Sequence, residues 1–158
     1  MATAQCTLFE RERGVTEVAV RSDLAHIAIH CDADGRLAAL RALADGQVPI
    51  FLLKLSGNGF SCVVRRANAE RAVEILASTG DPFERTDNVA MVSTIAGTMR
   101  DLSGVIARIC DAMIEVDVRV LQTGDAYDAV HCLVDASAAE RAADALRRAF
   151  GISAEVES

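Results

Sequence analysis

The sequence lacks tryptophan, and aromatic residues make up only 4% of its 158 residues. Proteins that bind single-stranded nucleic acid stack bases on aromatic side chains, so the composition predicts no such platform. Basic residues are also few: 16 Lys and Arg stand against 23 Asp and Glu, for a net charge of −7. A surface that binds a duplex needs a basic face, and we therefore expect no nucleic-acid partner.

Long apolar runs and a secretory signal are missing as well. No stretch approaches the ~20 apolar residues that span a bilayer, and the N-terminal MATAQCTLFERERG has neither an apolar core nor a basic lead. We expect a cytoplasmic protein that does not bind membranes. The five cysteines are odd in number and form no C-x-x-C motif, which argues against a disulfide framework and a zinc knuckle.

What the chain does contain is a repeat. ERAVEILASTG begins at Glu70, and ERAADALRRAFG begins at Glu140, 70 positions later. Cys62 in FSCVV and Cys132 in VHCLV have the same spacing. A spacing repeated at separate places along the chain indicates two copies of one module.

The first copy has the pattern strand, helix, strand, strand, helix. Alternating or continuous apolar runs predict strands, apolar residues at helical spacing predict helices, and Gly-rich or Pro-containing segments predict turns. We expect Asn68 to cap the second helix and Gly80 to end it in a left-handed conformation. The expected elements are strands at 26–31, 49–56 and 60–66 and helices at 36–48 and 69–79.

The second copy has the same pattern, with its last helix opened by a capping box of Ser137 and Glu140. Its expected elements are strands at 89–97, 116–123 and 128–135 and helices at 104–116 and 138–150. Two layers with helices on one sheet face define an α+β class. The predicted modules are 21–80 and 89–151, with the strand at 14–20 completing the second sheet and with flexible termini at 1–13 and 152–158.

The strand PIFLLKLS, residues 49–56, is apolar on both faces. A sheet covered on one face should alternate between apolar and polar residues. We favour an oligomer in which a second subunit covers the extra apolar residues; the alternative is a long strand with a few exposed ones.

The second half has a valine-rich strand, followed by Met99, Arg100, Gly104 and Val105 and later by Ala139, Ala142, Leu146 and Phe150. In these residues it resembles the last ACT module of aspartokinases, which carries a valine-rich strand, then G-x-G-M-R/K-x-x-x-G-V, a helix, a short strand and a final D-x-x-x-A-x-x-A-L-x-x-x-F. The likeness covers roughly residues 14–151. The resemblance implies a ferredoxin-like fold of two βαββαβ modules side by side, a homodimer, and a small amino-acid effector, usually lysine or threonine.

The resemblance also implies where the effector binds, namely at the turn between the first strand and first helix of each module. Amides at a helix N-terminus suit its carboxylate and a nearby Asp suits its ammonium group. In the first module these groups are Asp32, Asp34, Gly35 and Arg36, with Ser61 where the family often has a Thr. In the second module they are Met99, Arg100, Asp101, Ser103 and Gly104.

Some effector-facing positions depart from the family. Its second module usually has N-x-N-I-E on the second strand, whereas this chain has Asp117 and Arg119 among valines. Losing an amide that pairs with a buried ligand group costs ~1–3 kcal/mol, so the usual effector would bind weakly or be replaced by another amino acid.

Catalysis and cofactors are not expected. The glycine-rich lysine motif of the kinase and the phosphate loop G-x-x-x-x-G-K-S/T are missing. His26 and His30 share a strand face and would need Asp32 or Cys62 to hold a metal, and His131 neighbours Cys132 on a strand, where adjacent side chains point apart. We therefore predict no enzyme. The resemblance implies an amino-acid sensor that regulates aspartate-family biosynthesis, with a separate kinase polypeptide as its partner if the chain is a regulatory subunit; the rival is a ligand-free assembly protein that dimerises or docks on a partner enzyme.

Overall fold

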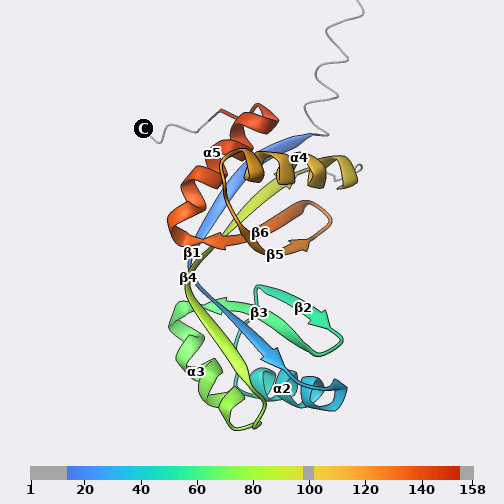
Figure 1. Ribbon diagram of the computed structural model, residues 1–158, viewed down its shortest axis with the longest axis vertical. Coiled ribbons are helices and arrows are strands. Elements are labelled where there is room, and N and C mark those ends of the chain that lie inside the picture. Colours follow the sequence, from blue (N-terminus) through green and yellow to red (C-terminus); the bar gives the residue numbers. More distant parts are fainter. Residues whose placement is uncertain (1–13, 98–101, 154–158) are drawn as a thin grey trace, which may run out of the picture. The chain divides into compact units, whose positions relative to one another are not determined.

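Helices and strands alternate along the chain, and the predicted α+β, ferredoxin-like class is confirmed (Figure 1). The computed structural model describes residues 14–97 and 102–153. Of the predicted flexible termini 1–13 and 152–158, residues 1–13 and 154–158 lie outside the described residues, whereas Ile152 is partly buried against the core of the second unit. The elements are β1 (Val15–His30), α2 (Ala33–Asp45), β2 (Leu52–Ser56), β3 (Gly59–Arg65), α3 (Arg66–Ala77), β4 (Phe83–Ala96), α4 (Leu102–Glu115), β5 (Val120–Asp125), β6 (Ala129–Asp135), the 3-10 turn η1 (Ala136–Ala138) and α5 (Ala139–Phe150).

The chain forms two compact units. The first unit is Ser22–Val89, and the second unit comprises the residues up to Arg21 and those from Ala90 onward. The two long strands are shared, because β1 begins in the second unit and ends in the first, while β4 begins in the first and ends in the second. The strand predicted at 14–20 is thus the first part of β1, in the second unit.

In the first unit the strand order is β2-β3-β1-β4. β1 and β3 are antiparallel from Leu24 opposite Arg65 to His30 opposite Gly59. Every second residue of β1 enters the core, where it packs with α2 and α3; the core includes Ala25, Ile27, Ile29, Ala39, Leu43, Phe60, Cys62, Val64, Ala69, Ala72 and Leu76. Both helices therefore cover the same face of the sheet (Figure 1).

In the second unit the strand order is β1-β4-β6-β5. β5 and β6 are antiparallel with a bulge at Leu121, because Val120 lies opposite Val134 while Gln122 lies opposite Leu133. The core again joins one sheet face to two helices, here α4 and α5, and includes Val18, Ala90, Val92, Ile109, Ala112, Met113, Val130, Cys132, Val134, Ala142 and Leu146.

The helices α2 and α4 end in the same way, 70 positions apart. Gln47 follows α2 with φ of 54°, and Asp117 follows α4 with φ of 54°. The next amide then returns to the last turn of the helix: Val48 N donates to Leu43 O at 3.0 Å, and Val118 N donates to Met113 O at 2.9 Å. The terminal carbonyl groups are thus paired in both units.

Several predicted boundaries are wrong. The helix expected from residue 36 begins at Ala33, and α3 begins at Arg66, so that Asn68 lies inside the helix and does not cap it. Ser137 does not cap the last helix: α5 has Ala138 at its N-cap and no side-chain cap bond. Asp135 caps the preceding turn η1, where its Oδ1 accepts from the amide and the hydroxyl of Ser137. Gly80 and Gly151 do adopt the left-handed conformation, with φ of 81° and 65°.

Candidate functional site

The N-terminus of α2 is the best described part of the predicted effector site. Asp32 caps this helix, and its Oδ1 accepts a hydrogen bond from the amide of Gly35 at 2.8 Å. The carboxylate of Asp81 is also close, since a Cβ added to Gly35 would lie 3.0 Å from Asp81 Oδ2. Two carboxylates of the protein thus lie at the positive end of the helix dipole. The Gly35 amide is therefore already paired within the protein, and an effector role for this turn stays a prediction.

Other residues of this turn have structural partners. Arg36 Nη1 donates to the backbone oxygen of Ser56 at 2.7 Å and so ties α2 to the end of β2. Asp34 is exposed in the first turn of α2. The pKa of the Cys31 thiol is raised, first by desolvation and then by the charge of Asp81. A raised pKa lowers the fraction of the nucleophilic thiolate at Cys31.

Ser61 does not join the turn on the helix side of the sheet. Its neighbours Phe60 and Cys62 point into the core beneath α2 and α3. Because successive residues of a strand point to opposite faces, Ser61 lies on the other face, opposite Ala28 of β1 and Lys54 of β2. An effector role for Ser61 stays a prediction.

The matching turn of the second unit is only partly described. Met99, Arg100 and Asp101 lie outside the described residues, and Ser103 and Gly104 are exposed in the first turn of α4. The strand expected from residue 116 begins at Val120. Asp117 is the left-handed residue after α4, and Arg119 also precedes the strand. Neither therefore occupies the strand position from which an effector contact was expected.

A cavity of about 100 Å³ lies between α4 and the strands β5 and β6. This cavity was not predicted from the sequence, because it arises from small side chains and not from a motif. A position-by-position comparison of the two repeats would reveal these smaller side chains. Burial raises the pKa of the Cys132 thiol to about 11, and the charge of Cys110 adds to the shift. The lining residues are Ile106, Ile109, Cys110, Val120, Thr123, Gly124, Asp125, Val130 and Cys132.

The opposite sheet face of the second unit carries a polar pair. Ser93 Oγ of β4 and His131 Nδ1 of β6 lie 2.8 Å apart, inside a hollow of about 330 Å³ that is also lined by Arg21 and Asp128. Burial lowers the pKa of His131, and the charge of Asp128 partly offsets this effect. His131 thus pairs with Ser93 and not with its chain neighbour Cys132, which points into the core.

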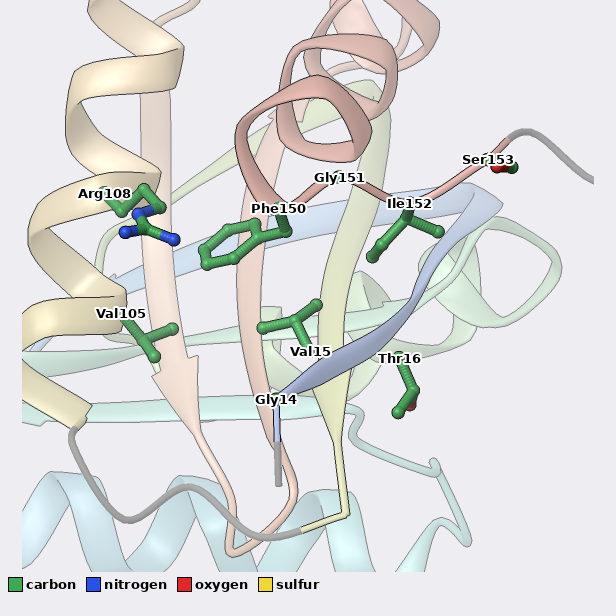
Figure 2. A pocket seen from close by; sticks show the side chains of 9 residues that line it. All are labelled: Gly14, Val15, Thr16, Val105, Arg108, Phe150, Gly151, Ile152 and Ser153. Atoms are coloured by element: carbon green, nitrogen blue, oxygen red, sulfur yellow. The ribbon is translucent and has the colours of Figure 1, made fainter. Parts of the chain in front are cut away.

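A larger groove of about 620 Å³ lies where the start of β1 meets α4 and the end of α5 (Figure 2). Figure 2 shows Arg108 on α4 beside Phe150 at the end of α5, with the guanidinium carbon 5.5 Å from the ring centroid. The remaining lining residues are Gly14, Val15, Thr16, Val105, Gly151, Ile152 and Ser153. The groove combines apolar walls with one cation.

Within residues 14–97 and 102–153, no group of three or more His, Cys, Asp or Glu side chains is placed to hold a metal ion. None of the helices in this part of the chain is long and apolar enough to cross a membrane.

Residues 84–148 match the ACT domain family model. The resemblance to aspartokinase regulatory regions is confirmed by solved structures. A chain of the aspartokinase alpha and beta subunits is 26% identical, with a TM-score of 0.80; the match covers 87% of this chain and 99% of that one.

Two further structures share the fold. The ligand-free regulatory subunit of aspartate kinase from Thermus thermophilus is 21% identical, with a TM-score of 0.78 and coverage of 87% of this chain and 99% of that one. The aspartate kinase of Clostridium acetobutylicum is 19% identical, with a TM-score of 0.76, and the match covers 86% of this chain but 34% of that one. A search of the curated proteins found no match.

Proposed function

We propose that this chain is a non-catalytic regulatory protein that binds a small amino acid, in the manner of the regulatory part of an aspartokinase. The observation that supports this proposal is the presence of two ferredoxin-like units in one chain. The structural match covers 99% of a regulatory subunit of aspartate kinase, and residues 84–148 match the ACT domain family model. Lysine and threonine are the first candidates for the effector. A ligand that binds one arrangement of the protein more tightly shifts the population toward it, and a partner enzyme can read that shift.

A thermal-shift measurement against the twenty amino acids tests this proposal. A ligand at about 100 times its dissociation constant adds ~2.7 kcal/mol to the free energy of unfolding. For a chain of this size that corresponds to roughly 5–11 °C in Tm. A flat response to all twenty contradicts the proposal.

A flat response would favour the rival function, a ligand-free assembly protein. The observation in its favour is the capped N-terminus of α2, where Asp32 already bonds the Gly35 amide. This rival predicts co-purification with a partner enzyme and no stabilisation by amino acids. The regulatory proposal also includes a separate kinase polypeptide as partner, but predicts that the complex responds to the effector.

The regulatory proposal includes a homodimer formed through the first unit. β2 stands at the end of the strand order, and its Leu53 and Leu55 are 46% and 56% exposed on the face that carries α2, where Leu37 is 50% exposed. A strand edge with unpaired backbone groups and an apolar border pairs well with its own copy across a two-fold axis.

Sedimentation analysis tests this interface. The double variant Leu53→Lys, Leu55→Lys should be monomeric at concentrations where the native protein is a dimer. Tyr127→Lys is the control, because Tyr127 is 79% exposed in the turn between β5 and β6 and should leave the dimer intact. A dimer that persists in the double variant excludes this edge.

A further inference from the structure

The groove beside Arg108 and Phe150 lies where the last helix of the second unit meets the strand that completes its sheet (Figure 2). In the first unit the matching elements are consecutive in the chain, since α3 ends at Ala77 and β4 begins at Phe83. In the second unit they are α5 and the start of β1, at opposite ends of the described chain. Within residues 14–97 and 102–153, no connecting segment therefore links the two elements across the groove.

The two repeats show that one wall of the groove is particular to the second unit. Arg108 corresponds to Ala38 at the offset of 70 positions that relates α4 to α2. Phe150 corresponds to Gly80 at the same offset. Alanine and glycine offer neither a cation nor an aromatic ring. The guanidinium group that lies 5.5 Å from the Phe150 ring centroid thus has no counterpart in the first unit.

The other walls are apolar. Val105, Phe150 and Ile152 pack against the core of the second unit and also line the groove. Figure 2 shows the side chains of Val15, Val105 and Phe150 around one hollow, so that β1, α4 and α5 each contribute a wall. A methylene group that is buried against such walls strengthens binding roughly fourfold. The walls therefore suit an aliphatic chain.

Arg108 gives the groove its charge. It is the one charged residue among the nine described residues that line the groove, although the chain carries 23 Asp and Glu. Arg147 on the neighbouring helix pairs with Asp144 at 3.0 Å. Within the described residues Arg108 has no such carboxylate, and its contact there is the Phe150 ring. A guanidinium group without an acid of its own is complementary to an anion, and its planar fork fits a carboxylate.

The size of the groove sets the size of the ligand. Its volume of about 620 Å³ lies in the range of small-molecule sites. At about 30 Å³ for each water-sized group, the groove holds roughly 20 such groups. A straight-chain carboxylate of about ten carbon atoms fills about half of this volume and leaves room for water. No acid among the described lining residues would pair with an ammonium group, so the groove does not suit an amino acid.

We propose that this groove binds an aliphatic monocarboxylate of medium chain length. The carboxylate pairs with Arg108, and the chain lies against Val15, Val105, Phe150 and Ile152. The site goes beyond the proposed regulatory function and does not depend on it, since neither the ligand class nor the lining residues are those of the amino-acid effector.

Calorimetric titration of sodium decanoate into the native protein tests the proposal and should show one site per chain. Octanoate has two methylene groups fewer and should bind about 10- to 20-fold more weakly. The uncharged 1-octanol has the same chain length as octanoate and provides the control for the charge. It should bind more weakly than octanoate, because it cannot form an ion pair with Arg108.

Two variants test the role of the cation. Arg108→Gln removes the charge at an exposed position and should weaken decanoate binding at least tenfold, while 1-octanol binds as before. Val105→Glu places a carboxylate one helical turn from Arg108 and should have the same effect on decanoate. Arg148→Gln is the matched control, because Arg148 is exposed on α5 and does not line the groove. This variant should bind decanoate as the native protein does.

Four results would overturn the assignment. The first is decanoate binding at native strength in Arg108→Gln. The second is equal weakening in Arg148→Gln, which would show general charge attraction. The third is no binding of decanoate to the native protein at millimolar concentration. The fourth is a lower oligomeric state of Arg108→Gln in sedimentation analysis without any decanoate binding to the native protein, which would make the groove a contact between two copies of the chain. None of these results bears on the binding of amino acids.

Discussion

The two units share a core and differ at their edges. Cys62, Ala72 and Leu76 in the first unit correspond to Cys132, Ala142 and Leu146 in the second, each at an offset of 70 and each buried. The outer strands do not correspond in character, because the exposed Leu53 and Leu55 of β2 are matched by Thr123 and Asp125 of β5. Packing beneath the helices therefore determines the common fold, whereas the edge strands are free to serve different interactions.

The units also differ at the entrance to their first helix. Ala25 and Ala90 are 65 positions apart, whereas the later pairs are 70 apart. The connection between β4 and α4 comprises five residues, 97–101, whereas the connection between β1 and α2 comprises two, Cys31 and Asp32. In the first unit β1 is followed almost at once by α2, and Asp32 caps it directly; the second unit has a longer connection at the corresponding place.

The largest expected effect comes from the shared core. Leu76→Ala and Leu146→Ala each remove a fully buried side chain and should each lower the free energy of unfolding by about 2–5 kcal/mol. Urea unfolding measures both losses. The two cores are not equivalent if the losses of unfolding free energy differ by more than the residual cavities can explain. A loss below about 1 kcal/mol at either position would also contradict their equivalence.

The two units also differ at the first residue of the strands β3 and β6. Gly59 has φ of 149°, and a Cβ there would lie 1.9 Å from the backbone oxygen of Ile29; the corresponding residue of the second unit is Ala129. Gly59→Ala should cost at least the ~1–3 kcal/mol of a strained backbone. Gly57→Ala, where an added Cβ meets nothing within 4 Å, is the control in thermal unfolding. Equal stability of the two variants would contradict the close packing at Gly59.

The cap of α2 should contribute less. Asp32→Ala removes the bond to the Gly35 amide and should cost ~1 kcal/mol. Asp34→Ala changes an exposed acid in the same turn without removing the bond, and its cost should be smaller. Denaturant midpoints of the two variants give the comparison, and an equal loss in both would show that helix charge and not the cap is responsible.

The smallest expected effect is the pH dependence of the unfolding free energy that arises from His131. The corresponding residue of the first unit is Ser61, which does not titrate. Burial lowers the pKa of His131 below the unfolded value of about 6.5. Between these two pKa values the unfolded chain binds more protons than the folded chain does. The contribution of His131 to the free energy of unfolding is therefore fully present above about pH 6.5 and decreases as the pH falls through this range. His131→Gln should reduce the slope of unfolding free energy against pH between 5 and 8; an unchanged slope would exclude His131 as its source.

The repeat, the element order and the helix-facing positions could be predicted because periodic burial leaves a direct mark on the sequence. The helix ends could not, since Gln47 and Asp117 adopt the left-handed conformation that sequence rules assign to glycine. The choice of Asp135 over Ser137 as a cap likewise depends on local geometry. The cavity beneath α4 could not be predicted, because no sequence motif marks an unfilled volume.

Native mass spectrometry of the purified protein, titrated with each of the twenty amino acids, tests the central claim most directly. We expect at least one amino acid to add its mass once per chain and to stay bound at moderate collision energy. Spectra that show no adduct with any of the twenty at millimolar concentration would contradict an amino-acid-binding role.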